Sequence, residues 1–185
     1  TINVARHIPI SSVSTLGGGS AIININGTVD QTVTGSGVAN GGKLCSVTIS
    51  KNSGTLRLQS VISIAGNLSY AATGTAILDP TSSTVALCNG SRTITGSFSL
   101  YNLTILANGN SLNYIGVNDI ITVNGELKTD GYSNATIYDG TIKAKGDFKI
   151  NNSYVFTGGT PVGTGTINIC RTGEQKITGV DNTKK

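Results

Sequence analysis

The sequence predicts an all-β protein, and more narrowly a parallel β-helix (β-solenoid), from three observations. First, Gly contributes 25 of the 185 residues, and Thr, Val, Ile, Asn and Ser fill much of the rest; these residues suit pleated strands and tight turns. Second, no window shows a sustained helical spacing of apolar residues. Third, three kinds of strand-like segment recur in a fixed order, as in solenoids. A β-sandwich is the alternative, because it also has short alternating strands separated by turns.

Each kind of segment has its own pattern. The first ends in apolar-Thr-Gly and occurs as AIININGTVDQTVTG (21–35), TVALCNGSRTITG (84–96) and TINICRTGEQKITG (166–179). The second occurs as KLCSVTI (43–49) and SLYNLTI (99–105). The third reads apolar-x-apolar-x-Gly-x-apolar and occurs as ISIAGNLSY (62–70), ITVNGELKT (121–129) and IKAKGDFKI (142–150).

These segments describe about two and a half copies of one long unit, within a single β-solenoid domain of residues 1–185. The copies cover approximately residues 20–80 and 84–150, with an incomplete copy over 166–185. The spacing from Gly125 to Gly146 suits one turn of a three-sided solenoid. We expect these glycines to mark a bend or close approach where a side chain would clash.

The region from 85 to 127 resembles the repeats of large secreted bacterial surface proteins of the adhesin type. Those repeats pair V-x-F-x-G-x-x-Q-x-I-x-G with F-x-N-L-x-I and V-x-G-x-L. The corresponding stretches here are 85–96, 100–105 and 123–127, and less closely 167–179. The resemblance implies a parallel β-helix used in adhesins, stalks or surface fibres, with no chemistry of its own.

Composition and charge narrow the class of partner. Only 12% of residues are charged, and the net charge of +4 is spread along the chain, whereas a nucleic-acid site needs a dense basic stripe. No run of residues is long and apolar enough for a transmembrane helix, so we expect neither nucleic-acid binding nor membrane insertion. The low charge, the lack of Met and the start at Thr1 suggest removal of a leader and an extracellular or cell-surface location.

The expected function is structural. Neither terminus shows a helical pattern that could cover an end of the solenoid, and an open end exposes unpaired backbone groups. We therefore expect a surface fibre or filament formed by end-to-end stacking of identical copies or tandem units. The expected contact residues are Thr1, Ile2, Val4, Ile177, Val180 and Lys185.

Three other functions stay open. An adhesin stalk or tip would present loops such as 107–120 or 151–165 to a glycan or host surface. An ice-binding protein would use the Thr-x-Thr pairs at 32/34, 93/95 and 164/166. A polysaccharide-processing enzyme is disfavoured: most of the nine Asp and Glu residues lie in turns, Trp is absent and the tyrosines are scattered, so neither a facing carboxylate pair nor a sugar platform is evident. We expect no enzyme activity and no cofactor.

The remaining candidate sites are weaker. Asp130, Asn134 and Asp139 could form a calcium-binding turn, although a polar turn is the default. Cys45, Cys88 and Cys170 are small core residues or include one disulfide between adjacent turns. His7 is the only histidine and reads as a surface or partner-contacting residue. Six Asn-x-Ser/Thr sequons are candidate glycosylation sites, at Asn26, Asn67, Asn89, Asn102, Asn134 and Asn151.

Overall fold

The structure, a computed structural model, describes residues 1–14, 17, 19–88, 90–107, 111–131, 135–151 and 164–179. Over these residues the chain is all-β without a helix, and every strand pairing is parallel. The parallel β-solenoid is thus confirmed. The β-sandwich alternative is wrong, because sandwiches are built from antiparallel strands.

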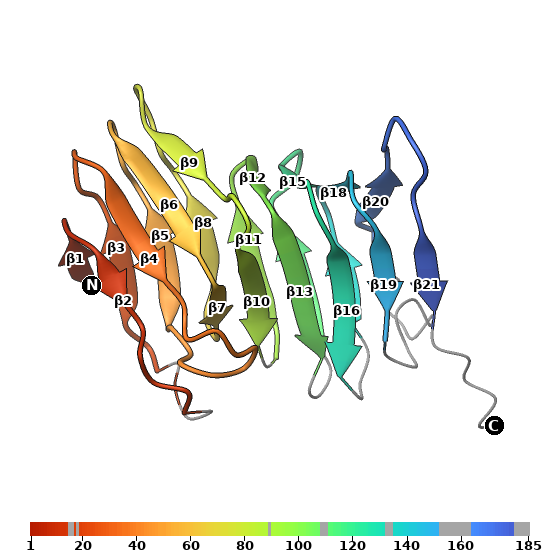
Figure 1. The fold of residues 1–185 in the computed structure, drawn as a ribbon, viewed down its shortest axis with the longest axis horizontal. Coiled ribbons are helices and arrows are strands. Elements are labelled where there is room, and N and C mark those ends of the chain that lie inside the picture. The colour runs from red at the N-terminus through yellow and green to blue at the C-terminus, as the bar shows by residue number, and fades with distance from the viewer. Residues whose placement is uncertain are drawn as a thin grey trace.

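The strands wind in about six turns around three sides, which we number in the order that the chain visits them (Figure 1). Side 1 contains β1 (Ile2–Val4), β3 (Ile22–Ile25), β5 (Ser46–Ile49), β8 (Leu68–Tyr70), β11 (Arg92–Thr95), β14 (Ser111–Ile115) and β17 (Ala135–Tyr138). Side 2 begins with β2 (Ile8–Pro9), β4 (Gln31–Thr34), β6 (Thr55–Gln59) and β9 (Ile77–Asp79). It continues, after a break in the hydrogen bonding, with β12 (Phe98–Leu100), β15 (Ile120–Val123), β18 (Thr141–Ala144) and β20 (Thr166–Ile169). Side 3 contains β7 (Val61–Ile64), β10 (Thr84–Cys88), β13 (Asn102–Ala107), β16 (Leu127–Gly131), β19 (Phe148–Ile150) and β21 (Ile177–Gly179).

The turn length predicted from Gly125 and Gly146 is confirmed by the register. Ile121 pairs with Ile142 and Leu127 with Phe148, so both pairs repeat the spacing of the two glycines. Turn length varies elsewhere: the turn from Thr84 to its partner Asn102 is shorter, and the turn from Phe148 to its partner Ile177 is longer. The corners absorb this variation, because the strands themselves must keep their length to stay in register.

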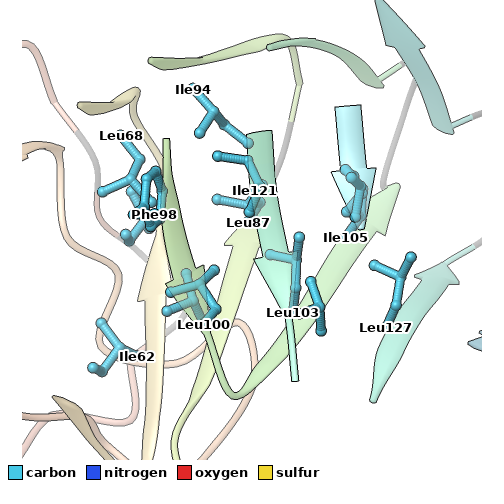
Figure 2. Close-up of a cluster of buried hydrophobic side chains, with 14 of the residues drawn as sticks. Ile62, Leu68, Leu87, Ile94, Phe98, Leu100, Leu103, Ile105, Ile121 and Leu127 are labelled. Carbon is cyan, nitrogen blue, oxygen red and sulfur yellow. The ribbon is translucent and has the colours of Figure 1, made fainter. Parts of the chain in front are cut away.

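The hydrophobic core fills the space between the three sides, and its residues are those that strand alternation points inward (Figure 2). In β6, Leu56 and Leu58 point inward and are buried, whereas Arg57 and Gln59 are exposed. In the segment ITVNGELKT, alternation puts Ile121, Val123 and Leu127 on one face, and all three are fully buried. Each turn buries apolar side chains on those of the turn before it, so no turn forms a core by itself.

Sequence similarity does not identify the side on which a segment lies. KLCSVTI runs into β5 on side 1, but SLYNLTI runs into β13 on side 3. The apolar-Thr-Gly segments likewise start on sides 1, 3 and 2 in turn. All three sides use the same inward-outward alternation, so similar sequences fit any of them.

Candidate functional site

Both described ends of the solenoid expose core positions. Ile2 in β1 and Ile177 in β21 are each 56% exposed, and Ile169 in β20 is 42% exposed. The equivalent positions one turn inside are less exposed: Phe148 next to Ile177 and Ala144 next to Ile169 are buried, and Ile23 next to Ile2 is half-buried. The apolar column of the core therefore continues to each end without a described residue that closes it.

The edge strands at these ends have little to prevent further pairing. Strands β1, β20 and β21 contain no charged residue, and each is the outermost described strand of its sheet. Charged, proline-containing or bulged edges are the usual protection against edge-to-edge association; Pro9 in β2 is the one such residue in a described terminal strand. The order of sides would also continue from one unit to the next, because β21 lies on side 3 and β1 lies on side 1, which follows side 3 within the chain.

The predicted contact residues divide accordingly. Ile2, Val4 and Ile177 lie on terminal strands, and Thr1 precedes β1 directly. Val180 and Lys185 lie outside the described residues.

A column of buried polar side chains lines the corner between sides 1 and 2, and the sequence patterns did not predict it. The Gln31 amide donates to the carbonyl oxygens of Val4 (3.0 Å) and Arg6 (2.9 Å) on the turn before it. The Lys51 ammonium donates to Gln31 Oε1 (2.8 Å), to the Val29 carbonyl (2.9 Å) and to the Gly27 carbonyl. Gln31 and Lys51 are each 1% exposed, and burial lowers the pKa of Lys51.

The same kind of contact recurs at other corners. Gln175 donates to the carbonyls of Ala144 and Gly146 on the preceding turn, and Arg92 donates to the carbonyls of Cys88 and Ser91 in its own corner. Gln31, Arg92 and Gln175 each stand four residues before the Gly of an apolar-Thr-Gly segment. A polar residue at this fixed position in each segment is the sequence feature that could have predicted the corner contacts. The sequence gives no comparable indication for Lys51, because the residues around it do not recur in another repeat segment.

The corner between sides 2 and 3 forms an open polar groove. Tyr101, Glu126, Lys145, Asp147 and Arg171 line it, together with Asn102, Asn124 and the two stacked glycines Gly125 and Gly146. Glu126 and Asp147 lie on adjacent turns, since their neighbours Leu127 and Phe148 pair. Asp147 accepts hydrogen bonds from Arg171 (3.5 Å) and from the Lys176 backbone N–H (3.1 Å).

These two carboxylates are exposed. The basic side chains of Lys145 and Arg171 line the groove beside them. The groove therefore offers charged and polar groups of both signs to solvent.

The two described calcium candidates have other partners. Asp130 is the last residue but one of β16 and is paired with Lys128, whereas Asp139 follows β17 and accepts a hydrogen bond from Thr164 (2.9 Å). Asn134 lies outside the described residues. Within the described ranges, no three His, Cys, Asp or Glu side chains gather where they could hold a metal ion.

All three cysteines are free, so the disulfide alternative is not realised. Cys45 and Cys88 are buried as small core residues, and Cys170 is half-buried. The repeat pattern aligned Cys88 with Cys170, but Cys88 ends β10 on side 3 and Cys170 follows β20 on side 2. Burial raises the pKa of the Cys88 thiol, which makes it a poor nucleophile.

The sequon asparagines that the structure describes have structural contacts. Asn67 Oδ1 accepts the Thr93 N–H (2.9 Å), and Asn102 Oδ1 accepts the Glu126 N–H (2.7 Å), each one turn further on. Asn26, Asn102 and Asn151 are half-buried and Asn67 is exposed, while Asn89 and Asn134 fall outside the described residues. Hydrogen bonding between turns thus gives Asn67 and Asn102 a role that does not depend on glycosylation.

The other local expectations fare differently. Thr32 and Thr34 lie in β4 on side 2, Thr93 and Thr95 in β11 on side 1, so the predicted Thr-x-Thr row does not form on one side. Residues 111–115 form β14, so 107–120 is not one free loop, and 152–163 lies outside the described residues. His7 is exposed, and its Nδ1 accepts the Thr32 N–H (3.0 Å), which ties the first two turns together.

Among the residues described there is no helix that could cross a membrane. Comparison with protein family models, with curated proteins and with solved structures gave no match.

Proposed function

We propose that this chain is a structural, extracellular β-solenoid whose units stack end to end into a surface fibre or stalk. The observation that carries the proposal is the open core at both described ends, where Ile2, Ile169 and Ile177 are exposed on uncharged edge strands. The partner is another unit of the same kind, present as a separate copy or as a tandem repeat.

Stacking would repeat the contacts that already hold adjacent turns together. An incoming β1 on side 1 would place Ile2 and Val4 over the core, as Ile23 and Ile25 lie over them within the chain. Each buried Ile side chain contributes about 1.5–3 kcal/mol relative to its exposed state. The contact is heterologous, because one end differs from the other, so it extends into a filament and does not close as a dimer.

The extracellular assignment and the absence of catalysis belong to the same proposal. A composition rich in Ser, Thr, Asn and Gly and poor in charge suits a structural protein outside the cell. The resemblance to bacterial surface repeats favours the same role. Both groove carboxylates are exposed, and Asp147 is ion-paired with Arg171 (3.5 Å), which gives no support to an enzyme.

The test is assembly of the purified chain. We expect sedimentation velocity to show a mass that rises with protein concentration, and electron microscopy to show filaments of uniform width. Ile2→Lys should abolish both, because a lysine would then be buried at the junction without a partner.

The matched control is Ile77→Lys, because Ile77 is 59% exposed but lies within the solenoid at the start of β9. It should assemble like the wild type. Dispersed monomers of the wild-type chain at every concentration would contradict the proposal, as would equal effects of the two substitutions.

A further inference from the structure

Side 1 differs from the other two sides in charge. The outward strand positions described on side 1 carry only Asn, Ser, Thr, Ile and Tyr. Outward positions on side 2 include Arg57 and Lys143, and those on side 3 include Lys128 and Lys149. One long face of the solenoid is therefore neutral and rich in hydroxyl and amide groups.

This face is hollowed into a shallow trough. Its walls and floor include Ser46, Thr48, Asn67, Ser69, Thr93 and Thr95, from β5, β8 and β11 with the residue preceding β8. We call this feature the side 1 trough. It is open to solvent, and its volume, which includes space shared with the solvent, is about 510 Å³.

An aromatic wall stands at one end of the trough. Tyr114 is in register with Tyr138 on the next turn, and their rings stack with centroids 4.9 Å apart and an interplanar angle of 17°. One face of the Tyr114 ring is thus covered by Tyr138. Tyr114 is also the register partner of Thr93, which lines the trough, and Tyr114 is 37% exposed.

The floor keeps hydrogen-bonding capacity beside that ring. Asn67 uses its Oδ1 to accept the Thr93 N–H, which leaves the Asn67 amide group as a donor. The Ser46 Oγ accepts the Asn67 N–H (3.1 Å), which leaves its hydroxyl hydrogen to donate. The Thr95 hydroxyl donates a hydrogen bond to Ser69 Oγ (2.9 Å).

We propose that the side 1 trough binds a neutral polysaccharide. One sugar ring stacks on the face of Tyr114 that Tyr138 does not cover, and its hydroxyl groups form hydrogen bonds with Asn67 and Thr93. A ring bounded by apolar C–H faces and edged by hydroxyls needs an aromatic surface next to neutral donors and acceptors, and the trough supplies both. A nucleic-acid strand would also stack, but it requires a positively charged groove. Binding here is independent of end-to-end stacking, because the trough lies along a side.

The sequence disfavoured a sugar platform because the tyrosines are scattered. Tyr114 and Tyr138 are well separated in the chain, but their spacing is one turn on side 1, so folding stacks them. An ice-binding surface is less well supported, because Asn67 interrupts the row of hydroxyls and the Ser69 and Thr95 hydroxyls are bonded to each other.

The experiment is calorimetric titration with cellohexaose, xylohexaose, maltohexaose and mannohexaose, with oligogalacturonate as an acidic counterpart. The protein should come from a host that does not glycosylate asparagine, because Asn67 is also a sequon residue. We expect at least one neutral hexasaccharide to bind, and Tyr114→Ala to weaken that binding by about tenfold or more. Thr93→Tyr, which keeps Tyr114 but fills the trough, should weaken it similarly.

Tyr101→Ala is the matched control, because Tyr101 is 41% exposed and lines the other groove, between sides 2 and 3; it should bind like the wild type. The proposal is overturned if no neutral saccharide binds, if oligogalacturonate binds more tightly, or if Tyr101→Ala and Tyr114→Ala have equal effects. Thermal hysteresis without saccharide binding would also overturn it and identify the face as an ice-binding surface. Filament formation by Tyr114→Ala should be normal, so the two proposals fail separately.

Discussion

Gly146 illustrates how one residue fixes the spacing between turns. A Cβ added to Gly146 would lie 1.8 Å from the carbonyl oxygen of Gly125 and 2.4 Å from its carbon, both backbone atoms of the turn before. Gly125 itself leaves room for Asn102 Oδ1, and Gly66 for the backbone of Ser46. The three glycines of the apolar-x-apolar-x-Gly-x-apolar segments thus allow close stacking at corners, which confirms the sequence prediction for them.

Gly146→Ala should lower the free energy of unfolding by about 1–3 kcal/mol, because the backbone must move to admit the methyl group. Urea denaturation followed by circular dichroism measures the change. Gly173→Ala is the control, since a Cβ there meets nothing within 4 Å; we expect it to be neutral or stabilising by less than about 1 kcal/mol. A similar loss for both variants would show that chain flexibility, and not the close stacking, explains these glycines.

Individual side chains were predictable from the sequence only where alternation or turn chemistry constrains them. Val123 and Leu127 can be assigned to the inner face, because period-two alternation leaves one choice. The interturn role of Asn67 was not predicted, since its partner Thr93 lies on another turn and an Asn-x-Ser motif suggests a modification site. Long-range hydrogen bonds leave no local pattern by which they could be found.

At the scale of elements, the corners carry the polar requirements of the fold. Strand backbones are satisfied by neighbouring turns, but carbonyls at a corner diverge from the sheet and need other donors. Gln31 and Lys51 supply these donors from inside the corner between sides 1 and 2. The hydrogen-bond partners described for Lys51 are carbonyl and amide oxygens and include no carboxylate, so its charge is held by neutral acceptors.

Lys51→Met should reveal this buried charge through pH. Burial lowers the folded-state pKa of Lys51 below its usual value of about 10.5, so between the two values the unfolded chain binds more protons. The unfolding free energy of the wild type should therefore rise with pH across that window, relative to Lys51→Met. At pH 7 the variant should be less stable by about 1–3 kcal/mol, because buried acceptors lose their donor.

Denaturation of both proteins at several pH values between 7 and 10 measures the difference. Lys149→Met is the control, because Lys149 points outward from β19 and is half-buried; it should change the unfolding free energy at pH 7 less than Lys51→Met does. A pH-independent difference for Lys51→Met would show that burial does not disfavour the charged form of Lys51.

Elements were predictable in kind but not in position. The strand type, the parallel solenoid and the length of the turn from Gly125 to Gly146 follow from alternation and from the spacing of glycines. The assignment to sides does not, because turns of unequal length displace similar segments from one side to another. The separation of Cys88 from Cys170 and of Thr32 from Thr93 has this one cause.

At the scale of the whole molecule, the ends and the sides have different properties. The sides are hydrogen-bonded and largely polar, and sides 2 and 3 carry ion pairs such as Arg57 with Asp30 (3.0 Å) and Lys128 with Asp130. The ends expose Ile2 at one extreme and Ile177 at the other. If association uses the ends, it must join unlike surfaces, and this polarity can be tested directly.

Two variants that block opposite ends should complement each other. Ile2→Lys blocks the β1 end and Ile177→Lys blocks the β21 end, because each would bury a charge at the junction. Each variant alone should remain monomeric, because every junction needs one β1 end and one β21 end, and one of these is blocked in all copies of the variant. In an equimolar mixture, the free β21 end of the first can bind the free β1 end of the second. Because both outer ends of that pair are blocked, growth must stop at a dimer of twice the 18.9 kDa chain mass.

Multi-angle light scattering of the mixture distinguishes the possibilities. A two-chain species that appears only on mixing supports head-to-tail stacking. Dimers formed by either variant alone would indicate a symmetric contact between like surfaces, and a mixture that stays monomeric would show that the ends do not bind each other. The control pair Ile77→Lys and Val117→Lys, both at exposed positions away from the ends, should still form long filaments when mixed, because it blocks neither end.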